Sequence, residues 1–212
     1  MVTIHKELLC SCSPYYTAAL RGGFSESRKA SLDADMSSNT LKAFATWLYT
    51  GSLPSKGTHV EGAHDRQCCL INLYIFADLT DFLALRRATM NQLAAANMSL
   101  CSYTLVLEII SHLPDTDPLW KQTLGSYVSH WTPDCDDYAP GCYLDAELED
   151  GGRLLPGFMH EVLKEVALRT ELNPPGCSCC SNPCTYHEHE SEEEWKATCG
   201  KVKGSKLPES LL

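Results

Sequence analysis

Apolar side chains recur at steps of three and four residues along most of the chain, from Leu8 to Val166. This spacing places them on one face of a helix, so the pattern predicts a series of amphipathic helices. Proline, glycine and polar clusters divide the pattern into separate elements. Pro14 is expected to begin a new first turn, Gly51 to end a helix, and a break near Thr80 to separate two further helices.

Two short segments have the pattern typical of strands. Val2 to Lys6 begins with β-branched residues in alternation, and residues 30–33 form a second candidate. A helix capped by Ser37 or Ser38 follows the second segment. Together these elements predict an α+β fold with a small sheet and clustered helices, followed by a helical C-terminal extension.

The negative charge of the chain is concentrated in two stretches. The formal charge is −10, from 17 basic and 27 acidic side chains. Seven acids and no Lys or Arg lie between Asp134 and Asp150, and five more acids lie between Glu188 and Glu194. The other residues carry 17 bases against 15 acids, without the basic stripe that a phosphate backbone requires. We therefore expect no nucleic-acid partner, and we interpret residues 132–152 as an acidic loop.

Twelve cysteines make up about 6 % of the chain, which is less than in a disulfide scaffold. The first residues lack a basic stretch followed by an apolar one, and no apolar run reaches about 18 residues. We expect reduced thiols, a location in the cytoplasm or nucleus, and no membrane partner. The spacing of Cys and His can then be interpreted as metal chemistry.

The composition changes to Cys, His and Glu after the two prolines that follow Asn173. Five of the twelve cysteines lie between residues 177 and 199, together with two histidines. Thiolate and imidazole are ligands that zinc prefers. The acidic segment has little apolar surface to bury, so packing alone cannot offset the entropy of ordering it. We therefore predict one structural zinc ion in this tail.

The predicted zinc ligands are Cys184, His187, His189 and Cys199. The first three lie close in sequence and can converge through a turn, and the fourth can close the site if residues 192–197 form a short helix capped by Ser191. Three upstream cysteines compete to replace Cys199 or one histidine: Cys177, Cys179 and Cys180. The alternative is an acidic tail in which cysteines cluster without binding metal.

No residue pattern specifies catalysis. Cys10, Cys12 and His5 suggest a nucleophile with a base, but the cysteines fit a buried helical face, and the sequence shows no electropositive, accessible setting. The aspartates of the acidic loop lack the glycine and glutamate of an EF-hand, and phosphate-binding glycine patterns are missing. We predict that the chain is not an enzyme. The alternatives are a metal-dependent enzyme or a zinc-stabilised transcriptional regulator that uses the Cys/His-rich tail.

Three blocks in the first 95 residues resemble a BTB/POZ domain. They are Ile-His-Lys at 4–6 with Cys-Ser-Pro-Tyr-Tyr at 12–16 and Gly-Phe-Ser-Glu-Ser at 23–27, then Trp-Leu-Tyr-Thr-Gly-Ser-Leu at 47–53, and then Leu-Tyr-Ile-Phe-Ala-Asp at 73–78 with Leu-Arg at 85–86. Downstream, Leu-Pro-Asp-Thr-Asp-Pro-Leu at 113–119, Leu-Pro-Gly-Phe at 155–158 and the Tyr-His-Glu-His segment at 186–189 are similar to a group of mostly uncharacterised fungal BTB proteins.

The resemblance implies a non-enzymatic protein–protein interaction module that forms a homodimer or a heterodimer with another BTB protein. Some members deliver partners to cullin ubiquitin ligases, so a substrate-adaptor role is a further expectation. In the family the first helix contributes to the dimer surface, and a basic residue that matches Lys6 lies at the dimer groove. The implied interface residues are Lys6, Tyr15, Tyr16 and Leu20.

The resemblance also exposes a difference at the N-terminus. Most family members have an additional strand before the segment that begins at Thr3, and the chain shows none. We expect either a truncated sequence or a sheet with an open edge that another chain can extend.

These observations predict three parts. Residues 1–96 form the BTB/POZ-like domain without its first strand, residues 97–171 form a helical extension that contains the acidic loop, and residues 172–212 form the Cys/His-rich acidic tail.

Overall fold

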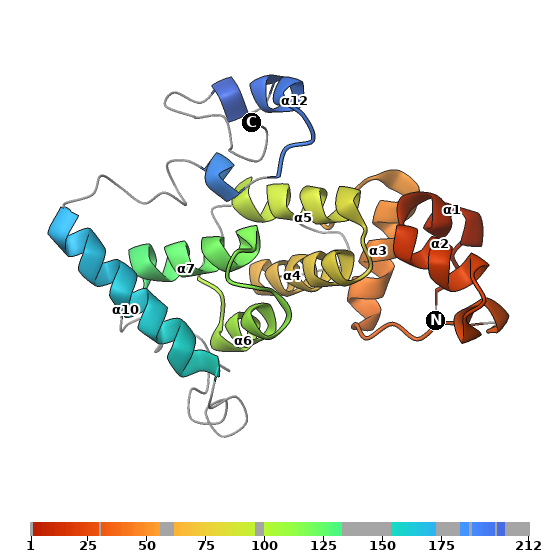
Figure 1. Cartoon of the computed structure of the whole chain (residues 1–212), viewed down its shortest axis with the longest axis horizontal. Coiled ribbons are helices and arrows are strands. Elements are labelled where there is room, and N and C mark those ends of the chain that lie inside the picture. The colour runs from red at the N-terminus through yellow and green to blue at the C-terminus, as the bar shows by residue number, and fades with distance from the viewer. Residues whose placement is uncertain are drawn as a thin grey trace. The chain divides into compact units, whose positions relative to one another are not determined.

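The computed structural model describes residues 2–29, 31–55, 62–95, 100–132, 154–172, 183–186, 188–197 and 199–201. It divides the chain into two compact units, Met1–Leu93 and Ala94–Leu212. Figure 1 shows helices joined by irregular segments within each unit. The three-part organisation of the sequence, with divisions after residues 96 and 171, stays a prediction.

The predicted α+β fold is wrong for the described part of the chain, where every regular element is an α-helix or a 3-10 helix. Residues 2–5 are irregular, and no described strand lies beside them to complete a hydrogen-bonded ladder. The backbone N–H of His5 instead donates to the hydroxyl of Tyr49, 3.0 Å away. Residues 31–33 of the second candidate segment also have no regular structure. The β-branched pattern favours extended backbone, but a strand also needs a neighbour.

Pro14 begins a new helix, as its position in the sequence predicts. Helix α1 (Lys6–Cys12) ends before it, and α2 (Pro14–Arg21) has the proline in its first turn, where its missing N–H removes no helical hydrogen bond. Ser13 caps α2, because its Oγ accepts a hydrogen bond from the N–H of Tyr16 at 3.1 Å. The same hydroxyl donates to the carbonyl oxygen of Thr80 at 2.6 Å. This buried serine thus ties the α1–α2 junction to a distant part of the chain.

Three longer helices complete the N-terminal unit: α3 (Ser38–Thr50), α4 (Ala63–Leu79) and α5 (Leu83–Ala95). The predicted helix signals are confirmed. Ser37 caps α3, and Gly51 ends it in the left-handed conformation at φ 71°. The break near Thr80 separates α4 from α5, and Asp81 has a positive φ of 52° there. The short 3-10 helix η1 (Ser25–Arg28) lies between α2 and α3.

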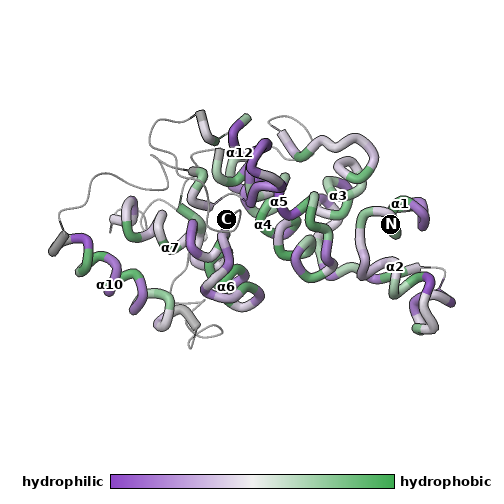
Figure 2. The backbone as a smooth tube through the Cα atoms, turned by 45° about the horizontal axis from the view of Figure 1, so that its top comes forward, coloured by the Kyte–Doolittle hydropathy of each residue, from purple (hydrophilic) through white to green (hydrophobic). Residues whose placement is uncertain are grey.

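The core of the N-terminal unit forms where α3, α4 and the start of α5 meet. Figure 2 shows hydrophobic residues along α4 beyond its first turns. Phe82 is fully buried, and its ring lies between 5.3 and 6.4 Å, centroid to centroid, from four other aromatic rings. Residues of α1 and α2 pack against this cluster from its edge. The buried members are Ala43, Phe44, Leu48, Cys69, Leu73, Ala77, Phe82 and Leu85.

The C-terminal unit has a second core between three helices, α6 (Tyr103–His112), α7 (Pro118–His130) and α10 (Leu154–Leu172). Ser102 caps α6, and Asp117 caps α7 just before its first-turn proline. Helix α10 contains Val166, at the end of the helical apolar pattern in the sequence. The ring of Phe158 packs edge-on against Trp120 and Tyr127, which joins α10 to α7. Except for Thr132, residues 132–152 of the predicted acidic loop lie outside the described residues.

Candidate metal centre

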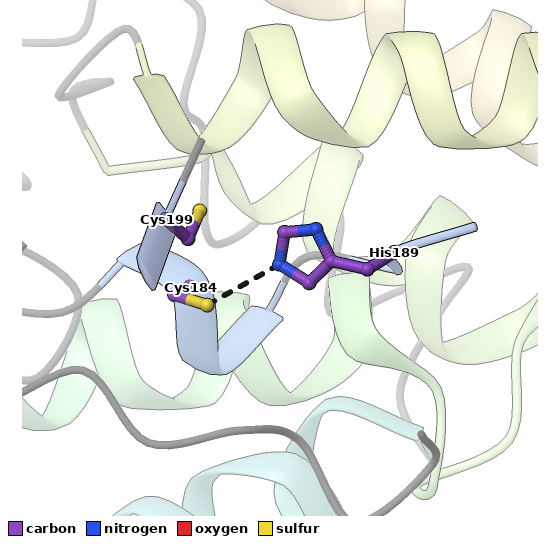
Figure 3. A group of neighbouring side chains, drawn as sticks. All are labelled: Cys184, His189 and Cys199. Atoms are coloured by element: carbon purple, nitrogen blue, oxygen red, sulfur yellow. Dashed lines mark hydrogen bonds between the residues drawn. The ribbon is translucent and has the colours of Figure 1, made fainter. Parts of the chain in front are cut away.

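Three of the four predicted metal ligands come together in the C-terminal unit. Cys184 lies on the 3-10 helix η2 (Pro183–Tyr186), His189 lies in the segment after it, and Cys199 begins the 3-10 helix η3 (Cys199–Lys201). One ligand atom from each side chain lies within 4.8 Å of the other two. Figure 3 shows the imidazole ring of His189 facing the sulfur of Cys184, with Cys199 beside them. The predicted fourth ligand, His187, lies outside the described residues, as do three competing cysteines: Cys177, Cys179 and Cys180.

The three side chains are buried, with exposed fractions of 4 % for Cys184, 7 % for His189 and 9 % for Cys199. The short helix that the sequence predicts beside them is confirmed as α12 (Glu192–Ala197). Its cap is also confirmed, because the hydroxyl of Ser191 accepts a hydrogen bond from the N–H of Glu194 at 3.1 Å. The turn of chain between His189 and Cys199 is therefore formed by this helix, which lets the two ligands meet.

Hydrogen bonds surround the three ligands. The Nε2 atom of His189 lies 3.3 Å from the sulfur of Cys184, and its Nδ1 lies 2.7 Å from a carboxylate oxygen of Glu194. The indole N–H of Trp195 donates to the sulfur of Cys184 at 3.1 Å. Sequence reasoning missed Glu194 and Trp195, because nothing in the residue order distinguishes this glutamate from its acidic neighbours.

The donor set fits a thiophilic metal ion. Two sulfurs and one imidazole nitrogen are ligands of structural zinc sites, where Zn–S is about 2.3 Å and Zn–N about 2.0–2.1 Å. Ligand atoms bound to one tetrahedral ion lie closer than about 4 Å to each other, so the observed spacing needs only a small contraction. Hard cations such as magnesium and calcium prefer oxygen ligands and do not fit this group.

Cys184, His189 and Glu194 also have the order of a cysteine nucleophile, a base and an orienting acid. A nucleophile must reach a substrate, and the buried Cys184 sulfur instead receives the indole N–H of Trp195. A catalytic triad also gives no reason for the sulfur of Cys199 to lie in the same group. The arrangement therefore favours metal ligation over nucleophilic catalysis.

The 3-10 helix η2, which carries Cys184, packs on α7 at a glycine. Gly125 lies inside α7, where glycine is less favourable than alanine by about 1 kcal/mol. A Cβ at this position would lie 2.6 Å from the hydroxyl oxygen of Tyr186 and 3.7 Å from its Cζ. Tyr186 is buried and shares η2 with Cys184, so this close approach fixes η2 against the helix.

Gly125→Ala is expected to destabilise the C-terminal unit by about 1–3 kcal/mol, because the new methyl group would displace the buried Tyr186 hydroxyl. In a Tyr186→Phe background the clashing oxygen is gone, and the same substitution is expected to stabilise the unit by about 1 kcal/mol through helix propensity. Chemical unfolding of the parent, both single variants and the double variant measures this reversal of sign. An effect of the same sign in both backgrounds would contradict the docking role of Gly125.

The four implied interface residues all lie on α1 and α2 of the N-terminal unit. The ammonium of Lys6 donates to the carbonyl oxygen of Leu20 at 2.6 Å, and Leu20 itself is buried. Tyr16 packs against Phe82, and burial raises the pKa of Tyr16 to about 12. Tyr15 is 49 % exposed. Tyr15 is therefore the more accessible of the two tyrosines, while an interface role for all four residues stays a prediction.

A cavity of about 670 Å³ lies beside these helices. Its lining includes Cys10, which is buried and whose thiol donates to the carbonyl oxygen of Tyr16 at 3.6 Å. Glu7 and Arg21, also in the lining, form an ion pair with each other. The geometry supports no catalytic role for this cavity.

Comparison with protein families identifies the N-terminal unit. A family model of the BTB/POZ domain matches the chain from residue 1 to residue 84. Residues 1–84 form a BTB/POZ domain. BTB/POZ domains are protein–protein interaction modules that mediate association, including dimerisation. The family resemblance of the three sequence blocks is thereby confirmed, and the match covers α1 to the beginning of α5.

A comparison with curated proteins gives no match to this chain. Within the described part of the chain, none of the helices has the length and apolar character that a membrane crossing requires.

Proposed function

We propose that this chain is a protein–protein interaction protein whose BTB/POZ domain pairs with a second copy or with another BTB protein through α1 and α2. The family match supports this function. The position of Tyr15 supports the surface: its exposed ring stands edge-on to Tyr16 at 5.2 Å between centroids, and Tyr16 is anchored against Phe82. An exposed aromatic ring on a rigid base is typical of an interface hot spot. The bond from Lys6 to the carbonyl of Leu20 holds the two helices together.

Self-association is expected at micromolar concentration, and Tyr15→Ala is expected to weaken it by about tenfold or more, as for a residue in a hot spot. Multi-angle light scattering over a concentration series measures the mass of both proteins. Leu79→Ala is the control, because Leu79 is also a large exposed apolar residue but lies at the end of α4. A parent that stays monomeric at high concentration contradicts homodimerisation, and equal effects of the two substitutions contradict the α1–α2 surface.

A substrate-adaptor role for a cullin ubiquitin ligase is the finer proposal, and its support is the family membership of residues 1–84. Affinity purification of the full chain from its native cells, followed by identification of the bound proteins, tests it. A cullin among the bound proteins is the expected result. Repeated recovery of partners without any cullin contradicts the adaptor role and leaves the interaction function in place.

We further propose that the C-terminal unit binds one structural zinc ion through Cys184, His189 and Cys199. The observation that supports this is the convergence of three buried ligand atoms within 4.8 Å. His187 remains the proposed fourth ligand on sequence grounds. Such a site saturated by protein ligands orders a segment and needs no open position for a substrate, in contrast to a catalytic site.

Elemental analysis of the protein purified without added metal tests the zinc site. The parent is expected to contain about one equivalent of zinc, and Cys184→Ser and His187→Ala are expected to lose most of it. Cys101→Ser is the matched control, since Cys101 is a half-buried cysteine of the same unit outside the ligand group. Less than about a tenth of an equivalent in the parent contradicts the site. If zinc is lost in Cys184→Ser but retained in His187→Ala, only the assignment of His187 as the fourth ligand is contradicted.

A further inference from the structure

We propose that Glu194 and Trp195, two adjacent residues of α12, form the outer shell of the metal centre. Glu194 fixes the tautomer of His189 that can bind metal, and Trp195 stabilises the thiolate of Cys184. This inference rests on the proposed zinc site and assigns a role to residues that are not themselves ligands. Outer-shell groups of this kind orient ligands and commonly change metal affinity by 10- to 100-fold.

The role of Glu194 follows from hydrogen-bond chemistry. A carboxylate can only accept hydrogen bonds, so the 2.7 Å contact between its Oε2 and Nδ1 of His189 requires the proton to lie on Nδ1. The neutral imidazole then has its lone pair on Nε2. Nε2 is the nitrogen that lies 3.3 Å from the sulfur of Cys184, on the side of the ligand group. Glu194 therefore prepares His189 to bind through Nε2.

The role of Trp195 follows from its contacts with both ends of the site. Its indole N–H donates to the sulfur of Cys184 at 3.1 Å, and a donor aimed at a thiolate stabilises its negative charge. The indole ring also packs against the residue after the third ligand, because a Cβ at Gly200 would lie 3.1 Å from the ring atom Cζ3. Trp195 thus contacts Cys184 directly and the backbone next to Cys199.

Other charged residues of α12 are exposed to solvent, and they provide a matched control for Glu194. Glu192 and Lys196 form an exposed ion pair at 2.6 Å, one helical turn apart. Glu193 is exposed and lies immediately before Glu194. Its charge and side-chain length equal those of Glu194, but it is not the acid that contacts His189. Glu193→Gln is therefore a closely matched control for Glu194→Gln.

The test uses the full chain loaded with Co²⁺, which reports the ligand set by its absorption, and Zn²⁺ competition to measure affinity. We expect the parent and Glu193→Gln to bind with the same affinity. Glu194→Ala, which loses both hydrogen bond and charge, is expected to weaken binding by about 10- to 100-fold. Glu194→Gln is expected to weaken it less, because glutamine keeps the side-chain length and one acceptor oxygen but no charge.

Trp195→Phe keeps an aromatic ring but removes the N–H donor together with part of the indole ring that lies against Gly200. The sulfur-to-cobalt charge-transfer band is expected to move to longer wavelength, because a thiolate without its hydrogen bond gives up electron density more easily. Trp131→Phe, which replaces a tryptophan elsewhere in the same unit, is expected to leave the band in place.

The outcomes distinguish the outer shell from the site itself. If the parent binds neither Co²⁺ nor Zn²⁺, both the zinc site and this inference are overturned. If the parent binds but Glu194→Ala retains its affinity, the role of Glu194 is overturned while the zinc site stands. An unchanged charge-transfer band in Trp195→Phe overturns the role of Trp195 in the same way.

Discussion

Removal of bound metal with a chelator is expected to raise the amide exchange rates in α12 about 100-fold and to leave those in α10 unchanged. Helix α12 has only six residues, four of them exposed, so neither its own hydrogen bonds nor its packing can keep it folded. A ligand present at about 100 times its Kd stabilises the state that binds it by about 2.7 kcal/mol, a factor of about 100 in the opening equilibrium. Hydrogen exchange followed by mass spectrometry measures both helices in the same sample.

Two variants control for direct effects of the chelator. Cys184→Ser is expected to show the fast α12 exchange without any chelator, and Cys101→Ser is expected to respond as the parent does. Unchanged exchange in α12 after the chelator has removed zinc would mean that packing alone orders the tail. That result would contradict a structural role for the ion but not its binding.

The group of Cys184, His189 and Cys199 could be expected from the sequence because metal-binding chemistry depends on residue type. Cysteine and histidine at short spacing indicate a metal in a chain that lacks disulfide density, and the capped helix over residues 192–197 follows from local rules alone. The role of Glu194 could not be predicted in this way. Five acids lie between residues 188 and 194, and only the turn of α12 selects the one that meets His189.

Within the residues that the structure describes, the sheet was the part of the fold that sequence patterns predicted wrongly. Helix caps and breaks such as Ser37, Gly51 and Pro14 depend on neighbours within one turn, so they are confirmed by the structure. A strand depends on backbone partners far away in sequence, which a short β-branched pattern cannot supply. Residues 2–5 are instead held by the contact between His5 and Tyr49, at the end of α3.

Phe82→Ala is expected to lower the free energy of unfolding of the BTB/POZ domain by about 3–5 kcal/mol, the usual cost of truncating a buried phenylalanine. Phe82 has no exposed surface, and its ring contacts aromatic rings from α2, α3 and α4. The cavity left by its removal would lie where these helices meet, so no single helix can move to fill it. Slowly exchanging amides of α4 report this free energy as a rise in rate of a hundred- to a few thousand-fold.

Phe24→Ala is the matched control, because Phe24 is 61 % exposed and its truncation is expected to change stability by less than about 0.5 kcal/mol. If Phe82→Ala fails to fold, Phe82→Leu can replace it. This variant keeps most of the side-chain volume and is expected to show a smaller loss of stability with the same pattern across the three helices.

Tyr16 connects this core to the proposed docking surface, since its ring touches both Phe82 and the exposed Tyr15. A destabilising substitution at Phe82 should therefore also weaken self-association. An unchanged association constant in such a variant would show that the docking surface does not depend on this core.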